Sequence, residues 1–191
     1  MARGKPRADA ILTATIELLA ETGYAALTID AVAARAHASK ATVYRRWRGK
    51  PALIKAALDS LDAEHNAAIP DTGALRSDLV SVMQAMRDKA TAPYVAMIQD
   101  LVHSARRDLA LAAALQSHTE AEQLSPFAIV LRRAVARKRL SAAAPTALVH
   151  DVAEAMILRQ LQTASPFDDA FISRVVDQLL LPLLRQKRSR N

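Results

Sequence analysis

The segment from Thr28 to Lys50, TIDAVAARAHASKATVYRRWRGK, constrains the fold more than any other part of the chain. Its residue order predicts two short helices separated by a tight turn. Thr28 and Ser39 are hydroxyl residues of the kind that cap helix N-termini, and each one precedes a run of helix-compatible residues. His37 and Ala38 lie between the two runs. The segment therefore predicts a helix-turn-helix.

The second helix of this segment has small residues at its start and basic and aromatic residues further along. Such a helix can enter the DNA major groove, where Ala and Ser allow close approach while Lys, Tyr and Arg reach phosphates or base edges. We expect Arg45 to read bases and Trp47 to close the small core with its ring. Lys50 begins the next helix, whose N-terminus is expected to bind a phosphate. The residues predicted to contact DNA are Arg7, Thr28, Ser39, Lys40, Ala41, Thr42, Tyr44, Arg45 and Lys50.

Four motifs follow one another in the first third of the chain: ETGY, TIDAVA, SKATVY, and an aromatic residue shortly before a Lys-Pro step. Together they resemble the DNA-binding domain of the tetracycline-repressor (TetR) family of bacterial transcription regulators. One departure lies in the turn, where that family usually has Gly then Val and this chain has His37 and Ala38. Gly adopts the left-handed conformation most easily, although His also visits it. The departure predicts a slightly strained turn or an altered helix angle.

The rest of the chain is helical in its pattern. A linker is expected over 69–73, and no glycine follows Gly73. No run shows the alternating β-branched pattern of a strand. We therefore predict an all-α fold of about nine helices. The helix-turn-helix DNA-binding domain is expected in 1–50 with a linking helix over 50–67, and a helical ligand-binding and dimerisation domain in 68–191. The expected helices include 7–22, 74–90, 92–106, 108–138 (kinked or split at Pro126), 145–163 and 168–186, with Pro182 bending the last turn.

The net charge of +7 is concentrated at the two ends of the chain. Residues 1–50 hold nine Lys and Arg against four Asp and Glu, whereas residues 51–184 hold thirteen against fifteen. A basic N-terminal part favours a polyanion as partner. The basic side chains of Arg3, Lys5 and Arg7 either follow a phosphate backbone or belong to an unstructured end. We expect the basic tail, 185–191, to be simply solvated.

Several classes of protein are disfavoured by what the chain lacks. It has no cysteine, and therefore no disulfide or thiolate site. Glycine-rich phosphate loops, a G-x-S-x-G elbow and the H-E-x-x-H metal motif are all absent. No apolar run is long enough to span a bilayer, and no signal peptide is visible. The absence of cysteine suits a reducing cytoplasm, and the resemblance implies that this cytoplasm is bacterial. We expect a protein that is not an enzyme and has no cofactor, no metal and no membrane partner.

The C-terminal two thirds are expected to supply a ligand pocket and a dimer interface. Methionine lines adaptable apolar cavities between helices, although plain core packing explains each methionine equally well. The predicted pocket residues are Met83, Met86, Tyr94, Met97, Leu101, His103, Phe127, Leu131 and Met156. The last two helices carry broad apolar sides, and the resemblance implies that they form a four-helix interface between two subunits. The predicted dimer residues are Leu148, Val152, Ala155, Phe171, Ile172, Val175, Val176 and Leu179.

The resemblance implies a homodimeric transcriptional regulator, more often a repressor than an activator. A small apolar or amphipathic effector would release it from a palindromic double-stranded DNA operator. Two alternatives stay open. One is a helical small-molecule enzyme with a vestigial DNA-binding domain, which the lack of paired carboxylates, cysteine or a metal triad disfavours. The other is a DNA-binding protein without sequence preference.

Overall fold

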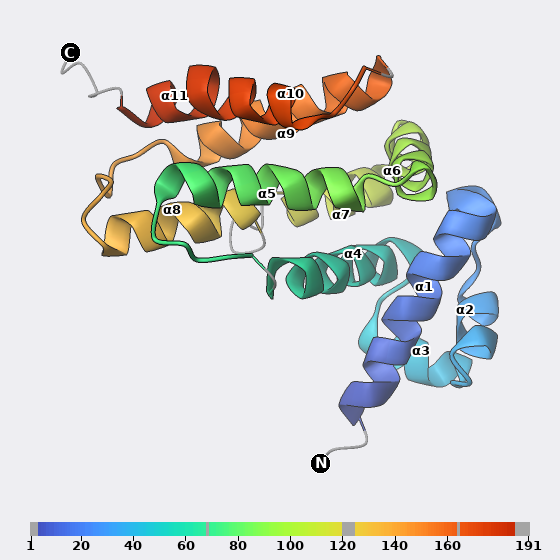
Figure 1. Ribbon diagram of the computed structural model, residues 1–191. Helices are drawn as coiled ribbons and strands as arrows, with labels where there is room; N and C mark the ends of the chain where they lie inside the picture. Colours follow the sequence, from blue (N-terminus) through green and yellow to red (C-terminus); the bar gives the residue numbers. More distant parts are fainter. Residues whose placement is uncertain (1–3, 68, 120–124, 164, 186–191) are drawn as a thin grey trace. The chain divides into compact units, whose positions relative to one another are not determined.

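The computed structural model describes residues 4–67, 69–119, 125–163 and 165–185, and every regular element in these ranges is helical (Figure 1). The predicted all-α class is confirmed. The helices are α1 (Gly4–Ala26), α2 (Ile29–Arg35), α3 (Lys40–Arg46), α4 (Lys50–Ala67), α5 (Leu75–Lys89), α6 (Ala92–Ala105), α7 (Leu109–Thr119), α8 (Pro126–Ala136), α9 (Thr146–Gln162), α10 (Asp169–Val175), the π-helical segment η2 (Val176–Leu180) and α11 (Leu181–Arg185). None of the helices described in these ranges is both long and apolar enough to cross a bilayer.

The helices form two compact units, each with its own hydrophobic core. The first unit holds α1 to α3, α4 as far as Glu64, α6 and α7, and the second holds α5 and α8 to α11. The sequence predicted one C-terminal domain from residue 68 onward, so α6 and α7 pack in a different unit from the expected one. The reason is that Met97, Leu101 and Leu111 are buried in the same core as α1 to α4.

Helix α1 braces the first unit with an apolar face. Its residues at helical spacing, among them Ile11 and Leu19, are almost fully buried. The sequence predicted that Gly23 would end this helix. The backbone of Gly23 does leave the helical conformation, with φ of 75° and ψ of 173°, although helical geometry returns as far as Ala26. A Cβ at this position would also lie 3.1 Å from the carboxylate of Asp100.

The predicted long helix over 108–138 is divided into α7 and α8. Helix α8 begins at Pro126, and the hydroxyl of Ser125 accepts a hydrogen bond from the Ala128 backbone N–H at 3.3 Å. Proline suits the first position of a helix, where its missing N–H has no partner to lose, but it would break a helix interior. The prediction of an interruption at Pro126 is therefore confirmed.

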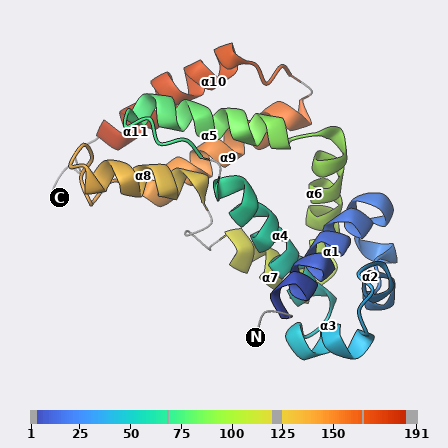
Figure 2. The same ribbon diagram turned by 60° about the horizontal axis from the view of Figure 1, so that its bottom comes forward.

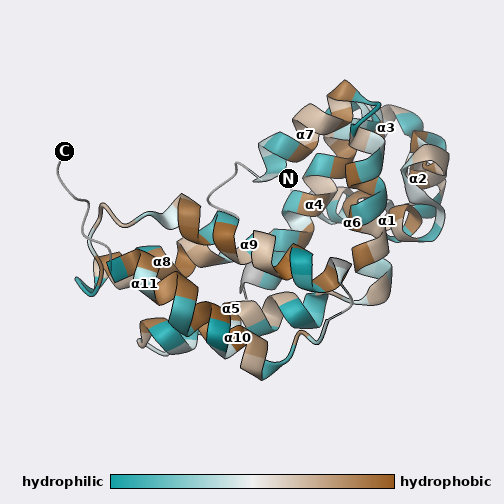
Figure 3. Ribbon diagram, turned by 90° about the horizontal axis from the view of Figure 1, so that it is seen from above, coloured by the Kyte–Doolittle hydropathy of each residue, from teal (hydrophilic) through white to brown (hydrophobic). Residues whose placement is uncertain are grey.

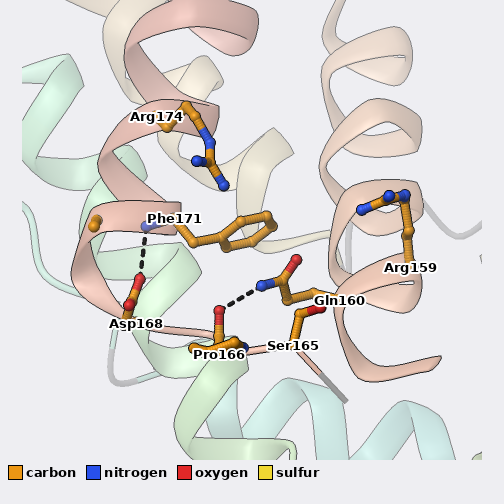
Figure 4. Close-up of a pocket in the computed structure, with 8 residues that line it drawn as sticks. Arg159, Gln160, Ser165, Pro166, Asp168, Phe171 and Arg174 are labelled. Carbon is orange, nitrogen blue, oxygen red and sulfur yellow. Dashed lines mark hydrogen bonds between the residues drawn. The ribbon is translucent and has the colours of Figure 1, made fainter. Parts of the chain in front are cut away.

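The final helical run contains an irregularity near its proline. Its first part, α10, begins after Asp168, whose side chain caps the helix (Figure 4). The π-helical segment η2 separates α10 from α11 and ends two residues before Pro182. Since Pro182 has no N–H to give to the carbonyl of Gln178, the regular hydrogen-bond ladder cannot continue through it. The sequence predicted a bend in the last turn, and the structure places the irregularity just before it.

The second unit is built around a buried aromatic ring. Phe127 is fully buried together with Leu79, Leu131 and Ile172, which come from α5, α8 and α10. Figure 3 shows apolar and hydrophilic residues alternating along the helices of this unit, as helices packed on one side require. Burial of these apolar side chains supplies most of the stabilisation of this unit, at about 1.5–3 kcal/mol for each large side chain.

Candidate nucleic-acid interface

Two side-chain caps define the helix-turn-helix. The Thr28 Oγ1 accepts a hydrogen bond from the Ala31 N–H at 3.1 Å at the start of α2. The Ser39 Oγ accepts one from the Thr42 N–H at 3.2 Å at the start of α3. Each cap satisfies a backbone N–H that the first helical turn leaves without a partner. Both predicted caps are confirmed, so these two hydroxyl groups have a structural role within the protein.

The turn between α2 and α3 is a Schellman motif with histidine at its left-handed position. His37 has a φ of 48°, and its N–H donates to the Ala34 carbonyl at 3.2 Å. The Ala38 N–H donates to the Ala33 carbonyl at 2.8 Å. These two hydrogen bonds define the motif, which normally places glycine where His37 stands. His37 therefore adopts the left-handed conformation that glycine adopts most easily, and both hydrogen bonds of the motif are formed. The predicted strain or altered helix angle remains a prediction.

Helix α3 has one buried side and one exposed side. Val43 is fully buried, and Trp47, the residue that ends the helix, packs against the same core. Both residues anchor the helix, and the predicted core position of Trp47 is confirmed. The opposite side is the α3 outer face, which we define as Lys40, Ala41, Tyr44 and Arg45, and all four of these residues are exposed. Figure 2 shows α3 at the edge of the first unit.

The two basic side chains of the α3 outer face differ in whether an acidic side chain already pairs with them. The ammonium of Lys40 lies 2.8 Å from the carboxylate of Asp30, and this hydrogen bond raises the pKa of Lys40. Both side chains are more than half exposed, so a phosphate can replace Asp30 at little cost. Within the described parts of the chain the structure shows no ion pair to Arg45. The exposed guanidinium of Arg45 is thus the readiest group on this face for a base edge or a phosphate.

Lys50 has a different role from the predicted phosphate contact. Its Nζ donates to the backbone carbonyl of Tyr24 at 2.6 Å and to that of Leu27 at 3.1 Å. The same atom lies 3.9 Å from the centroid of the Tyr24 ring. Burial lowers the pKa of this lysine. Lys50 therefore holds the connection between α1 and α2 against the start of α4, and its ammonium points into the protein.

Two carboxylates from α6 and from the residue before α7 hold the same connection. The Tyr24 N–H donates to Asp100 at 2.5 Å, and the Tyr24 hydroxyl donates to Asp108. Asp108 also accepts the Leu111 N–H at 3.0 Å and so caps α7. Burial and the Asp108 carboxylate raise the pKa of Tyr24, and the Tyr24 hydroxyl lowers the pKa of Asp108. We call Tyr24, Lys50, Asp100 and Asp108 the Tyr24 network.

A second polar contact joins α4 to α7. His118 Nδ1 lies 2.6 Å from Asp59 and Nε2 lies 3.4 Å from Asp62. Lys55 contacts the other oxygen of Asp59 at 2.5 Å. Burial lowers the pKa of His118, but the hydrogen bonds and charges of Asp62 and Asp59 outweigh burial, so the net shift is upward. Neither this contact nor the Tyr24 network was predicted from the sequence. The one local signal was that Asp108 precedes a helix, as capping residues do.

The basic N-terminal end is only partly described. Arg7 is exposed on α1, and the backbone of residues 4–6, which the sequence predicted to be unstructured, belongs to α1. Arg3 and the tail over 186–191 lie outside the described residues. A DNA contact by Arg7 remains a prediction.

Comparisons with known proteins agree with this architecture. The profile described as "Bacterial regulatory proteins, tetR family" matches residues 11–57, and the one described as "Tetracyclin repressor-like, C-terminal domain" matches residues 69–179. A protein of Mycobacteroides abscessus named DNA-binding transcriptional repressor TetR is 45% identical over 185 residues, which cover 97% of each chain. The chain belongs to the TetR family. It is a DNA-binding transcriptional regulator.

Other proteins are similar to this chain along most of their length. An uncharacterized HTH-type transcriptional regulator of Mycobacterium bovis is 34% identical over 181 residues, covering 94% of this chain and 88% of the relative. The crystal structure of the TetR family transcription regulator SCO0332 matches with a TM-score of 0.72 at 30% identity, covering 89% of this chain and 94% of the other. The multidrug binding protein EbrR, crystallised with imidazole, has the same fold at 20% identity, with a TM-score of 0.61 and coverage of 97% and 98%.

The pocket residues predicted for this TetR-family chain are divided between its two cores. Met83, Phe127 and Leu131 are fully buried packing residues of the second unit, and Met86 and Met156 pack against them. Met97 and Leu101 are buried in the first unit, where Tyr94 packs against them. His103 is exposed on α6 and lines neither core. The structure thus gives packing roles to all of these residues except His103, and a cavity among them remains a prediction.

Half of the predicted dimer residues are inside the second unit rather than on its surface. Phe171, Ile172, Val175 and Val176 are each at most 3% exposed, because η2 and α10 pack on α5 and on the core around Phe127. The broad apolar side of the last helix packs in the monomer core, and a dimer contact by these four residues remains a prediction. Leu148, Val152, Ala155 and Leu179 remain on the surface or at its margin.

Proposed function

We propose that this TetR-family regulator is a homodimeric repressor that binds a near-palindromic operator through α3 and is released by a small apolar or amphipathic molecule. The single observation that carries the operator contact is the exposed α3 outer face, with Val43 anchoring the opposite side of the helix. The 45% identical relative is named a repressor, which supports the sign of regulation. Because its partner is chromosomal DNA, we place the protein in the bacterial cytoplasm.

The α3 outer face offers separate groups for bases and for phosphates. Ala41 lets the helix approach the groove floor closely, and Arg45 presents a planar guanidinium of the kind that pairs with guanine. Tyr44 is 49% exposed and can place its hydroxyl on a phosphate, as can Lys40 once it leaves Asp30. Phosphate contacts fix the register of α3 on the duplex, and Arg45 supplies the sequence preference.

An exposed apolar face on α9 supports the dimer. Leu148 and Leu158 are 46% and 42% exposed, and Ala155, at helical spacing between them, is also exposed. Leu179 of η2 is 37% exposed. Large apolar side chains in a row on one helix face are typical of an interface. A two-fold dimer would present two copies of α3 to major grooves about 34–36 Å apart.

The Tyr24 network supports a response to an effector. The connection from α1 to α2 is bonded to Asp100 of α6 and to Asp108 at the start of α7. A ligand that shifts α6 or α7 therefore acts directly on the helices that support α3. Since a ligand changes an equilibrium only by its differential affinity for two states, the released state must bind the effector better than the DNA-bound state does.

The test is a fluorescence anisotropy titration of the protein against its own upstream intergenic DNA and a scrambled duplex of equal length, over a series of salt concentrations. We expect a preference of about a thousand-fold or more for the native sequence at physiological salt. Arg45→Ala should lower the affinity of the dimer for native DNA by about thirtyfold or more, because each of the two subunits loses one base contact worth about 1–3 kcal/mol.

The matched control for Arg45 is Arg132→Ala, which removes an exposed arginine of α8 and should leave the affinity unchanged. Equal affinity of the wild type for native and scrambled DNA would instead indicate a DNA-binding protein without sequence preference. Full retention of binding by Arg45→Ala would reject the assigned role of α3. Light scattering on the same samples tests the dimer, and a monomer at working concentrations would refute it.

A further inference from the structure

A carboxylate of α2 lies at the α3 outer face. Asp30 is in the first turn of α2, and its side chain is exposed. Its Oδ1 lies 2.8 Å and its Oδ2 3.0 Å from the Nζ of Lys40, the first residue of α3. Both carboxylate oxygens therefore contact the same ammonium group.

The backbone fixes the place of this carboxylate. The caps of Thr28 and Ser39 define the starts of α2 and α3, and the hydrogen-bonded turn at His37 joins the two helices. Lysine has a long side chain with many rotamers, whereas the short side chain of aspartate has few. The Asp30 carboxylate therefore stays close to the start of α3, whichever way Lys40 turns.

Other carboxylates of the first unit are engaged elsewhere. Glu21 binds Arg35 at 2.6 Å, and Asp100 accepts the Tyr24 N–H. Within the described residues, Asp30 is the carboxylate that contacts a side chain of the α3 outer face. It is therefore the negative charge of this unit that a DNA phosphate on that face would meet.

A phosphate that binds Lys40 comes close to Asp30. A charge-assisted N–H···O hydrogen bond is about 2.8 Å long, so a phosphate oxygen on this ammonium lies within about 6 Å of the carboxylate. At that distance in water, repulsion between two like unit charges weakens binding about threefold. The repulsion acts over about 8 Å at physiological salt, so it persists when Lys40 turns away from Asp30.

The ion pair between Lys40 and Asp30 contributes little by itself, because both side chains are more than half exposed. What matters for DNA is the carboxylate that remains beside the phosphate after the pair has separated. Sequence-independent binding to DNA is almost wholly electrostatic, whereas base contacts supply the sequence preference. A negative charge at this place lowers the electrostatic attraction and leaves the base contact of Arg45 in place.

We propose that Asp30 limits the sequence-independent affinity of the α3 outer face for DNA by offsetting the phosphate contact of Lys40. The inference deepens the operator contact proposed for α3 and rests on it. A chromosome offers very many competing sites, so a weaker sequence-independent affinity leaves more of the protein free to reach its operator.

The test is fluorescence anisotropy of the full chain with the native upstream duplex and the scrambled duplex over a salt series. Asp30→Asn should raise the affinity for both duplexes about tenfold at low salt, which is about threefold for each subunit of the dimer. The slope of log affinity against log salt concentration should become steeper by about one for each subunit.

The matched control is Glu64→Gln, which removes the same charge from an exposed residue of the first unit. Glu64 is near the other end of α4, about 20 Å from Lys50 along the helix axis. That distance exceeds two screening lengths at physiological salt, so this variant should bind both duplexes like the wild type there.

A double variant tests the offset itself. Lys40→Gln alone should weaken binding to both duplexes, because it leaves the Asp30 carboxylate unbalanced. If the two charges cancel, Asp30→Asn combined with Lys40→Gln restores the affinity and the salt slope of the wild type. A purely structural role of Asp30 would not change the salt slope, which depends on the charges at the interface. Circular dichroism melts confirm that each variant is folded.

Three outcomes would overturn the proposal: unchanged affinity of Asp30→Asn, weaker binding by Asp30→Asn, or a double variant as weak as Lys40→Gln alone. Arg45→Ala in the same assay separates this failure from failure of the operator contact. If Arg45→Ala weakens binding while Asp30→Asn has no effect, α3 still contacts DNA and only the role of Asp30 is rejected. Full binding by Arg45→Ala rejects the α3 contact and, with it, the role of Asp30.

Discussion

The Tyr24→Phe substitution tests whether the Tyr24 network stabilises the first unit. The change removes one hydroxyl and keeps the ring, which is 8% exposed and lies beneath the Lys50 ammonium. The hydrogen bond to Asp108 is lost, whereas the backbone N–H of Tyr24 keeps its contact with Asp100. The substitution therefore isolates the link to Asp108 without creating a cavity.

The expected loss of unfolding free energy follows from the kind of hydrogen bond that Tyr24→Phe removes. A hydrogen bond to a charged group contributes about 1.5–3 kcal/mol. The loss from Tyr24→Phe should lie near the lower end, about 1.5 kcal/mol, because Asp108 is half-buried and keeps the Leu111 N–H. For a chain of this length that corresponds to a fall in Tm of about 3–6 °C.

The assay is urea and thermal unfolding followed by circular dichroism, with Tyr44→Phe as the matched control. Tyr44 is 49% exposed on α3, so its hydroxyl contributes little to the fold. We expect the control to lie within about 0.5 kcal/mol of the wild type. If Tyr24→Phe were as stable as Tyr44→Phe, the Tyr24 network would have no energetic role and the reasoning would fail.

The stability difference between the wild type and Tyr24→Phe depends on pH through the pKa shifts of Asp108 and Tyr24. The folded pKa of Asp108 is lowered, so its contribution is present above the unfolded value near 3.9 and is lost as the pH falls through the folded value. The folded pKa of Tyr24 is raised, so its contribution is complete below the unfolded value near 10 and declines above it. The difference in free energy of unfolding between the wild type and Tyr24→Phe should therefore be largest between about pH 5 and 9 and should decrease outside that range.

Three further predictions concern other parts of the chain. His37→Gly should stabilise the protein by about 0.5–1 kcal/mol in urea unfolding, since glycine adopts the left-handed conformation of this position without the steric clash of a Cβ atom. Lys138→Gly, at the same position of a Schellman motif after α8, should do the same, and destabilisation by both would contradict the reasoning. His118→Gln should cost more stability at pH 5.5 than at pH 8.5, because the raised folded pKa of His118 stabilises the fold below about 6.5 and this contribution is lost as the pH rises through the folded value. A cost independent of pH would show that His118 acts only through packing. Leu148→Glu should convert the dimer to monomer in light scattering without lowering the Tm of the monomer, since Leu148 is 46% exposed. A dimer that persists would place the interface elsewhere.

Most of the local structure of this chain was predictable from short stretches of sequence. The caps Thr28 and Ser39, the left-handed turn at His37 and the helix start at Pro126 all depend on hydrogen bonds between residues at most five positions apart. Short stretches of sequence predict these features because the backbone conformation of each residue depends mainly on its neighbours. The exposed side of α3 followed in the same way from helical spacing around the apolar Val43.

The roles of several side chains depended on contacts that no local pattern encodes. Lys50 has the position of a phosphate-binding residue at a helix start, yet its ammonium binds carbonyls 23 and 26 residues away. Asp100 and Asp108 contact Tyr24 across 76 and 84 residues. From sequence alone, a carboxylate within a predicted helix is expected to be solvated, and only the packing of the helices shows that it has a partner.

The sequence by itself therefore determined the helical class, the caps of α2 and α3 and the exposed side of α3, because each of these arises within one or two helical turns. The tertiary structure alone decided which apolar faces are core and which are surface. It buried Phe171 and Val175 and exposed Leu148 and Leu158. An amphipathic helix shows only that it must pack against something, and its partner is selected by the shape and burial of the whole unit.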